Sequence, residues 1–259
     1  VQPLSRVGYV PTAALLVRRS ALVDGRGRPA AFDADLRYGE DVDLIWRLDA
    51  VGWRIRYDPS VVVTHRESHL WRDRVIRRFR YGTSAAPLSQ RHPEAIAPLV
   101  VAPWPALTVL AVATGRHRAA VLAGAATVRA GQRAVRRANL PPGAIPRPAA
   151  SSVAASWTGI GRYATQFAVP ILLAGLHRGR VERPARTWWR RAATIGLLAA
   201  PPISSWRARQ PAVDPVRFGI GHFVDDVAYG AGVIAGCVRR HTTTPLRPTM
   251  VSRPSKQVT

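Results

Sequence analysis

The feature that most constrains the fold is a change in the character of the chain near residue 93. Before this point the sequence has the composition of a soluble α/β piece, and most of the 15 acidic residues precede Glu94. After it, apolar stretches alternate with clusters of arginine. The clusters lie at 129–137, 178–191, 207–217 and 239–240. We therefore expect an α/β domain part over 1–93, a basic helical region over 94–242 and a disordered, Thr/Pro/Ser-rich tail over 243–259.

Two helices are expected in the first part. Val42, Ile45 and Leu48 recur at helical spacing, which predicts a helix over Glu40–Val51 that ends at Gly52. A second, strongly basic helix is expected over Leu70–Tyr81.

Three strands are expected around the first helix. Tyr9–Arg18 is a β-rich apolar run, Trp53–Tyr57 alternates before Pro59, and Ser60–Thr64 is rich in β-branched residues. A turn is expected over Gly25–Arg28. Helices and strands in this order predict an α/β fold for the first part.

The net charge indicates an anionic partner. Lys and Arg number 38 against 15 Asp and Glu, a formal charge of +23, so nucleic acid, acidic lipid headgroups and a nucleotide diphosphate all qualify. No helix-turn-helix, zinc or RNA-recognition motif is visible, so we expect no nucleic-acid partner, and a basic nucleic-acid-binding protein is the alternative. The single cysteine, Cys237, excludes an internal disulfide.

The second part has the pattern of a membrane-associated region. Ala95–Gly115 has no charged residue over 21 positions, the length of a membrane span. Pro98, Pro103 and Pro105 would kink it, so a re-entrant or interfacial helix fits equally well. Short apolar stretches between arginine clusters fit a surface on an anionic cytoplasmic leaflet, so we expect anionic membrane lipids as partners and the cytoplasmic face of the cell membrane as location.

Two carboxylates interrupt a later apolar stretch. Asp225 and Asp226 lie within Phe218–Val238 and would be costly in lipid. We expect them to face arginines or to cap a helix, and not to be catalytic.

The strongest chemical signal is Gly39-Glu40-Asp41-Val42-Asp43, which places three carboxylates in four positions where a loop meets a helix. Helix capping is one interpretation, because acids in a first turn stabilise the helix dipole by about 0.3–1 kcal/mol. A catalytic site is the other. It is favoured because the helix continues with Trp46-Arg47-Leu48 and a predicted strand ending in His65 follows.

The order of these segments resembles the family 2 glycosyltransferases of the GT-A fold. The segments are Phe32-Asp33, Gly39–Leu48, Gly52–Pro59 and Val61–His65. The resemblance implies the acceptor-side, C-terminal half of a GT-A domain and an inverting transfer. Asp41 would be the general base, Glu40 would orient the acceptor or the base, and Asp43 would contact substrate. His65 would be a metal ligand, or alternatively a strand-end histidine bonded to backbone.

A basic segment after the base resembles the Gln-x-x-Arg-Trp segment of processive relatives. In Arg77-Arg78-Phe79-Arg80-Tyr81, Arg77 replaces the glutamine, Tyr81 replaces the tryptophan and Arg80 matches. The resemblance implies that these three side chains contact acceptor and diphosphate, with Arg80 neutralising the leaving group. A solvated basic helix face is the alternative.

A closer resemblance, to the mycofactocin-system glycosyltransferases of actinobacteria, rests on three runs. They are Tyr9–Ala14, Tyr81–Pro93 and Val224–Gly232. It implies transfer of glucose from UDP-glucose onto a mycofactocin-type, peptide-derived redox cofactor, with a divalent metal, Mg or Mn.

The uridine pocket and the Asp-x-Asp metal motif of such enzymes are not visible, and the first residue is Val. We therefore expect further sequence upstream, carrying the main metal ligands. An inactive, membrane-bound remnant of a transferase is the alternative.

Overall fold

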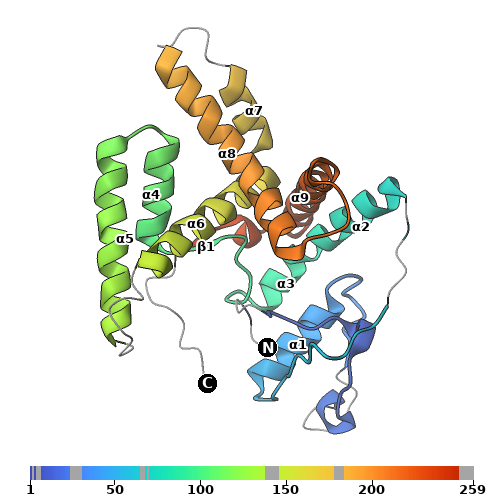
Figure 1. Ribbon diagram of the computed structural model, residues 1–259. Helices are drawn as coiled ribbons and strands as arrows, with labels where there is room; N and C mark the ends of the chain where they lie inside the picture. The colour runs from blue at the N-terminus through green and yellow to red at the C-terminus, as the bar shows by residue number, and fades with distance from the viewer. Residues whose placement is uncertain are drawn as a thin grey trace. The chain divides into compact units, whose positions relative to one another are not determined.

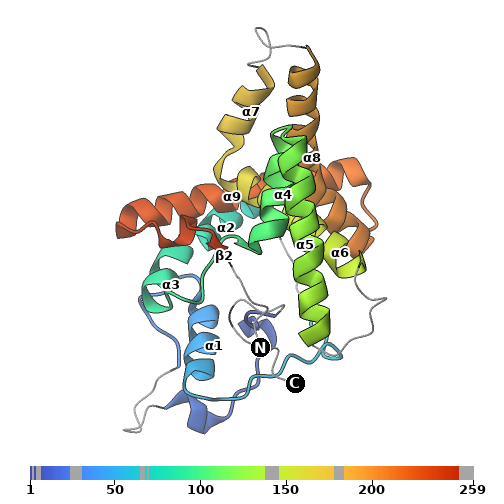
Figure 2. The ribbon, with the colours of Figure 1, turned by 90° about the vertical axis from the view of Figure 1, so that its left-hand side faces the viewer.

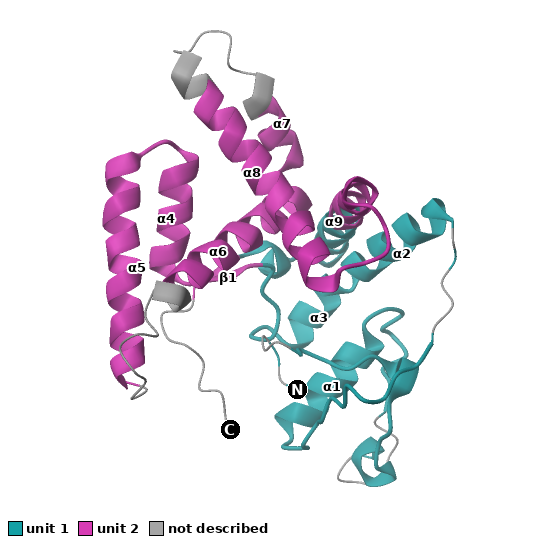
Figure 3. Cartoon of the chain, viewed as in Figure 1, with its two compact units in different colours: residues 1–98, 228–247 teal, residues 99–227, 248–259 magenta. Residues whose placement is uncertain are grey.

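The computed structural model describes residues 1, 3, 7–23, 31–64, 68, 70–137, 146–177 and 184–250 (Figure 1). These residues are mostly helical. They form two compact units (Figure 3): residues 1–98 with 228–247 make unit 1, and residues 99–227 with 248–259 make unit 2. The first division falls after Pro98, five residues beyond the predicted boundary at 93, and unit 1 also takes a segment from the other end of the chain.

The predicted first helix is confirmed as α1, Glu40–Ala50. Gly52 ends it in the left-handed conformation, with φ of 87°. Its amide donates to the carbonyl of Asp49, and the amide of Trp53 donates to that of Leu48, 2.9 Å away. This pair of bonds is the Schellman motif, which a glycine at this position favours. Gly25–Arg28 lies outside the described residues.

Helix α1 carries the core of unit 1. Leu44, Ile45 and Leu48 are buried, and Trp46 donates from Nε1 to the carbonyl of Gly8 at 2.8 Å. Ile45 and Trp46 pack with buried residues from other segments. These are Val10, Leu36 and Leu88.

The predicted strands are not formed as ladders in the described residues. Residues 9–22 instead hold two short 3₁₀ helices, η1 (Thr12–Ala14) and η2 (Arg19–Leu22), linked by extended backbone such as Leu15, with φ −122° and ψ 119°. The β-branched run Val61–Val63 has no assigned secondary structure and its side chains are 53–83% exposed. The local dihedral angles are those of strands, but a strand is stable only when a neighbour satisfies its backbone groups. The expected α/β fold is therefore replaced by a mostly helical one.

The predicted basic helix is confirmed as α2, Trp71–Thr83, and is followed by α3, Ala85–Arg91. Within unit 1, α2 crosses the second half of α9 (Pro215–Arg240) at very close range. A Cβ on Gly82 would overlap the backbone of Tyr229, and one on Gly232 would overlap the carbonyl of Phe79. A Cβ on Gly236 would lie 2.7 Å from the carbonyl oxygen of Thr83. The crossing therefore requires glycine on both helices.

Unit 2 begins with a helical hairpin. Helices α4 (Pro103–Ala113) and α5 (His117–Arg137) lie side by side in both views (Figures 1 and 2). Gly115, with φ of 69°, makes the turn between them. Trp189 fixes this turn, because its Nε1 donates to the carbonyl of Val112 at 2.7 Å and its ring meets His117 edge to face.

The remaining helices of unit 2 pack around α6, Pro146–Phe167. They are α7 (Val169–His177), α8 (Pro184–Arg209) and the first half of α9. Trp157 on α6 donates to the carbonyl of Gly196 on α8 at 3.0 Å. A Cβ on Gly161 would overlap the carbonyl of Leu197, so α6 and α8 also need a glycine where they cross.

Asp226 faces arginine, as expected from the sequence. Only 2% of its side chain is exposed, and its Oδ1 accepts from Arg162 Nε and from Gln166 Nε2, each at 3.0 Å. Its Oδ2 lies 3.3 Å from His222 Nδ1. Burial acts to raise the pKa of Asp226, but His222, Arg162 and Gln166 outweigh it and the pKa is lowered. This carboxylate therefore ties α9 to α6 as an ion.

The apolar stretch 95–115 forms α4 and the short strand β1 (Val100–Val101) and not one long helix. Within the described ranges, every helix is too short or too polar to cross a membrane. Part of the segment predicted to be a disordered tail is ordered: Thr244–Leu246 forms η4, and β2 (Thr249–Met250) pairs in parallel with β1. Residues 251–259 lie outside the described residues.

We predict that Gly232→Val destabilises the chain by about 3 kcal/mol, because the branched side chain would overlap the backbone of α2 where the two helices cross. The midpoint of thermal unfolding should fall by roughly 5–10 °C, measured by circular dichroism. Gly219→Val on the same helix is the control, since no atom lies within 4 Å of a Cβ there. Equal melting temperatures for the two variants would contradict the close crossing.

Candidate functional site

The acid cluster, Glu40, Asp41 and Asp43, follows a glycine that no other residue could replace without strain. Gly39 has φ of 81° and is the N-cap of α1, and its carbonyl accepts from the amide of Asp43 at 2.9 Å. A Cβ there would lie 2.9 Å from Leu88 and 3.1 Å from Ser84. Gly39 thus turns the chain so that Glu40 and Asp41 open the helix beside α3.

Glu40 and Asp41 line a cavity of about 670 Å³ within unit 1. This size suits a small-molecule or sugar ligand. Asp41 Oδ1 accepts from the amide of Val42 at 2.8 Å, so it also serves the helix terminus, as the capping interpretation expects. Its other oxygen, Oδ2, accepts no hydrogen bond that the described residues show, which leaves it for a ligand.

Four tyrosines and two arginines, Arg37 and Arg78, also line the cavity. Tyr9, Tyr38, Tyr81 and Tyr229 line it together with Arg78. Tyr38 and Tyr81 meet edge to face with centroids 6.3 Å apart, and the Arg78 guanidinium lies 5.4 Å from the centre of the Tyr229 ring. Aromatic walls around a carboxylate are common where sugars or aromatic groups are bound.

The charges of the cavity act on one another. Partial burial raises the pKa of Tyr9, the Asp41 carboxylate raises it further, and Arg78 opposes the shift. The phenol of Tyr9 is therefore neutral at physiological pH and able to donate a hydrogen bond. The carboxylate of Asp41, the Tyr9 hydroxyl and the Arg78 guanidinium thus share one electrostatic environment.

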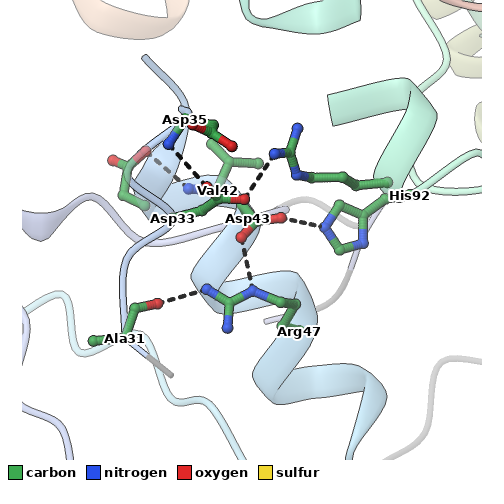
Figure 4. Close-up of polar contacts among 9 residues, drawn as sticks. Ala31, Asp33, Asp35, Val42, Asp43, Arg47 and His92 are labelled. Carbon is green, nitrogen blue, oxygen red and sulfur yellow. Dashed lines mark hydrogen bonds and ion pairs between the residues drawn. The ribbon is translucent and has the colours of Figure 1, made fainter. Parts of the chain in front are cut away.

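Asp43 has a different role from its two neighbours. It is 1% exposed and does not line the cavity. Its Oδ2 accepts from Arg47 Nε at 2.7 Å, and its Oδ1 lies 2.9 Å from His92 Nε2 (Figure 4). Arg47 in turn donates to the carbonyl of Ala31 at 2.5 Å. This placement favours a structural role for Asp43 over the predicted contact with substrate.

A neighbouring ion pair holds the loop before α1. Arg91 donates to Asp33 Oδ2 at 2.7 Å, and the amide of Asp35 donates to Asp33 Oδ1 at 2.9 Å. The backbone amide of Asp35 and then Arg91 lower the pKa of Asp33. Asp33 therefore helps to fix the loop that leads into Gly39.

The arginine of α2 that lines the cavity is not one of the two that the sequence predicts. Tyr81 lines the cavity, but Arg77 and Arg80 do not, and Arg80 is exposed. Arg78 lines it instead. Arg78 and Gly82 are four residues apart and so share the face of α2 that meets α9. The position of Arg78 on this face could have been predicted from the helical spacing. For Tyr229 the only indication in the sequence is the unusual run 224–232.

The predicted metal ligand, His65, lies outside the described residues. Across the described ranges no three acidic, histidine or cysteine side chains converge as a metal site would require.

The chain is similar over nearly its whole length to two curated proteins. Each is a pre-mycofactocin glycosyltransferase of Mycobacterium tuberculosis, from strains CDC 1551 and H37Rv, 34% identical over 259 residues that cover 96% of this chain and 52% of the relative. The chain thus spans about half the length of these relatives, which is consistent with a C-terminal part. The predicted resemblance to mycofactocin-system glycosyltransferases is confirmed.

A shorter match links the chain to another transferase. The N-acetylglucosaminyl-diphospho-decaprenol L-rhamnosyltransferase of Mycobacterium tuberculosis CDC 1551 is 42% identical over 71 residues, 27% of this chain and 22% of the relative. No protein-family model matches the chain, and no solved structure does.

We predict that Asp43→Ala lowers the free energy of unfolding by about 3 kcal/mol, because it leaves Arg47 and His92 without their shared buried partner. Asp41→Ala, on the same turn of α1, should cost less than about 1 kcal/mol, the usual value of a first-turn acid. Urea denaturation of both variants measures the difference. Similar losses in the two would show that Asp43 is not the structural member of the cluster.

Proposed function

We propose that this chain carries the acceptor-activating part of a glycosyltransferase that works by a single, inverting displacement. The observation that supports this most is the opening of Glu40 and Asp41 onto a cavity of about 670 Å³ that tyrosines and Arg78 line. A carboxylate at such a position can remove the proton from an acceptor hydroxyl as that oxygen attacks the anomeric carbon. The similarity to transferases gives independent support for this reaction class.

In this mechanism Asp41 is the general base. Its free oxygen takes the proton, the acceptor oxygen forms the new glycosidic bond, and the nucleotide diphosphate leaves from the opposite face of the sugar. Glu40 orients the acceptor from the adjacent wall. The neutral Tyr9 hydroxyl donates a hydrogen bond to the substrate, and Arg78 offsets the negative charge that two neighbouring carboxylates create.

For the substrates we propose a mycofactocin-type acceptor and UDP-glucose as donor. The names of the two M. tuberculosis relatives support the acceptor, and the sugar donor follows from the resemblance of the sequence. The aromatic walls of the cavity suit the apolar face of a sugar ring.

We further propose that the extended segments around α1 complete a nucleotide-sugar transferase domain of GT-A type. Residues 15–18 and 61–64 have strand-like sequence, and Leu15 and Arg18 have extended dihedral angles, but these segments pair with no described strand. Strands from further sequence would satisfy them, and that sequence would also bring the ligands of a Mg or Mn ion beside the donor diphosphate. A chain that is active only when extended would support this arrangement.

We propose a membrane surface as the location of the chain, contacted by the α4–α5 hairpin. Trp104, Leu107 and Leu110 follow one face of α4 and are each nearly half exposed. Arg116 and Arg118 are exposed at the turn of the same hairpin. Apolar side chains beside arginines are typical of helices that lie in the interface of an anionic membrane.

We predict that Asp41→Asn lowers the rate of UDP release from UDP-glucose and acceptor about 10²-fold or more, because the amide cannot accept the proton. The assay is run on this chain and, where its reading frame continues upstream, on the extended form. Asp49→Asn, near the other end of α1 and outside the cavity, is the matched control and should keep its rate. Near-normal turnover of Asp41→Asn would exclude Asp41 as the base, and inactivity of both forms would favour a transferase remnant.

We predict that a triple variant, Trp104→Ser, Leu107→Ser and Leu110→Ser, binds phosphatidylglycerol vesicles more than tenfold more weakly. Each lost side chain removes about 1.5–3 kcal/mol of apolar burial. Replacing Val61, Val62 and Val63 by serine, three exposed apolar residues of unit 1, is the control and should change binding little. Unchanged flotation of the hairpin variant, or salt-steep binding to duplex DNA without lipid, would contradict the proposal.

A further inference from the structure

A second, smaller cavity of unit 1 lies at the end of α9. It has a volume of about 180 Å³, and three arginines line it: Arg37 from the loop before α1, and Arg239 and Arg240 from the last turn of α9. The hydroxyl-bearing residues Tyr38, Thr83 and Ser84 line it too. We call this cavity the arginine crevice.

The charge of the arginine crevice is not balanced from within the protein. Asp35 is its single acidic lining residue, against three guanidinium groups. The side chains of Arg37, Arg239 and Arg240 make no ion pair or hydrogen bond with any residue in the described ranges. Three like charges around one crevice repel one another, and an anion bound between them removes that repulsion.

The packing of α9 sets the position of the two terminal arginines. Gly236 lets α9 touch the backbone of Thr83, where a Cβ would lie 2.7 Å from the carbonyl oxygen. One turn later, Gln90 Nε2 on α3 donates to the carbonyl of Arg240 at 3.1 Å. The last turn of α9 is thus held from two sides, so the arginines are presented to the crevice by an anchored backbone.

The arginine crevice adjoins the cavity of Asp41. Arg37, Tyr38 and Ser84 line both. The carboxylates of Glu40 and Asp41 line only the larger one, so an anion in the crevice avoids them. In an inverting displacement the leaving diphosphate and the base lie on opposite sides of the reacting carbon. A cationic crevice that shares a wall with the base but excludes its carboxylate fits that separation.

We infer that Arg37, Arg239 and Arg240 form a binding site for the diphosphate of a soluble nucleotide. Guanidinium groups bind phosphate oxygens through paired, charge-assisted hydrogen bonds, and the nearby hydroxyls can donate to the remaining oxygens. The ligand class rests on the proposed function, but binding itself requires no turnover. The site would explain why a tail helix far from the acid cluster in sequence ends beside it.

The test is the affinity for UDP and for inorganic pyrophosphate, measured by isothermal titration calorimetry at about 0.15 M salt. We expect Arg239→Ala/Arg240→Ala to weaken both at least tenfold, and Arg37→Ala to weaken both as well. The matched control is Arg136→Ala/Arg137→Ala, a tandem pair in the last turn of α5 that removes the same charge. Circular dichroism of each variant is compared with that of the unchanged chain, to check that these substitutions of exposed residues leave the fold intact.

Equal weakening by the two double variants would reduce the effect to overall charge and overturn the assignment. So would unchanged affinity in Arg239→Ala/Arg240→Ala, or loss of binding to phosphatidylglycerol vesicles with pyrophosphate affinity unchanged, which would make the end of α9 a lipid contact. Because the readout is binding, a failure of Asp41 as base and a failure of the arginine crevice give different results.

Discussion

Unit 1 depends on the contact between the backbones of α2 and α9. Gly82 and Gly232 let the two helices approach until a single added carbon would overlap the main chain. No side chain separates them there, so the position of one helix determines that of the other. This crossing sets the rotation of α9 about its axis and its position along that axis. Tyr229 therefore lines the cavity beside Arg78, and Arg239 and Arg240 line the crevice.

The acidic residues of the first turn of α1 have two different roles. Two positions along a helix turn the side chain by about 200°, so Asp41 and Asp43 point to nearly opposite sides. Asp43 faces the interior, where it pairs with Arg47 and contacts His92, whereas Asp41 faces the cavity. The buried member stabilises the helix end that presents the accessible ones. Helix capping and catalysis are alternative interpretations of the acidic motif in the sequence, and the structure is compatible with both.

The helices around the site could be predicted, because their signals are local: apolar spacing for α1 and α2, and a glycine for the end of α1. The strands could not, since Val61–Val63 and residues 9–18 have strand-like composition but form no ladder without a neighbour. Glu40, Asp41 and Tyr81, which motif order alone predicts as site residues, all line the cavity. Arg78 was missed because matching a motif ignored which face of α2 meets α9, and Tyr229 was missed because it comes from a distant segment.

Unit 1 is assembled from two segments that lie far apart in the sequence, so its synthesis is discontinuous. Residues 1–98 leave the ribosome before their partner segment, 228–247, which follows only after roughly 130 further residues. At the usual pace of translation that interval lasts on the order of 10 s. During it the glycine face of α2 and the wall that Tyr229 later supplies are open to water. Nascent chains therefore present this surface to chaperones until α9 emerges, and the earlier part of the unit completes its packing only then.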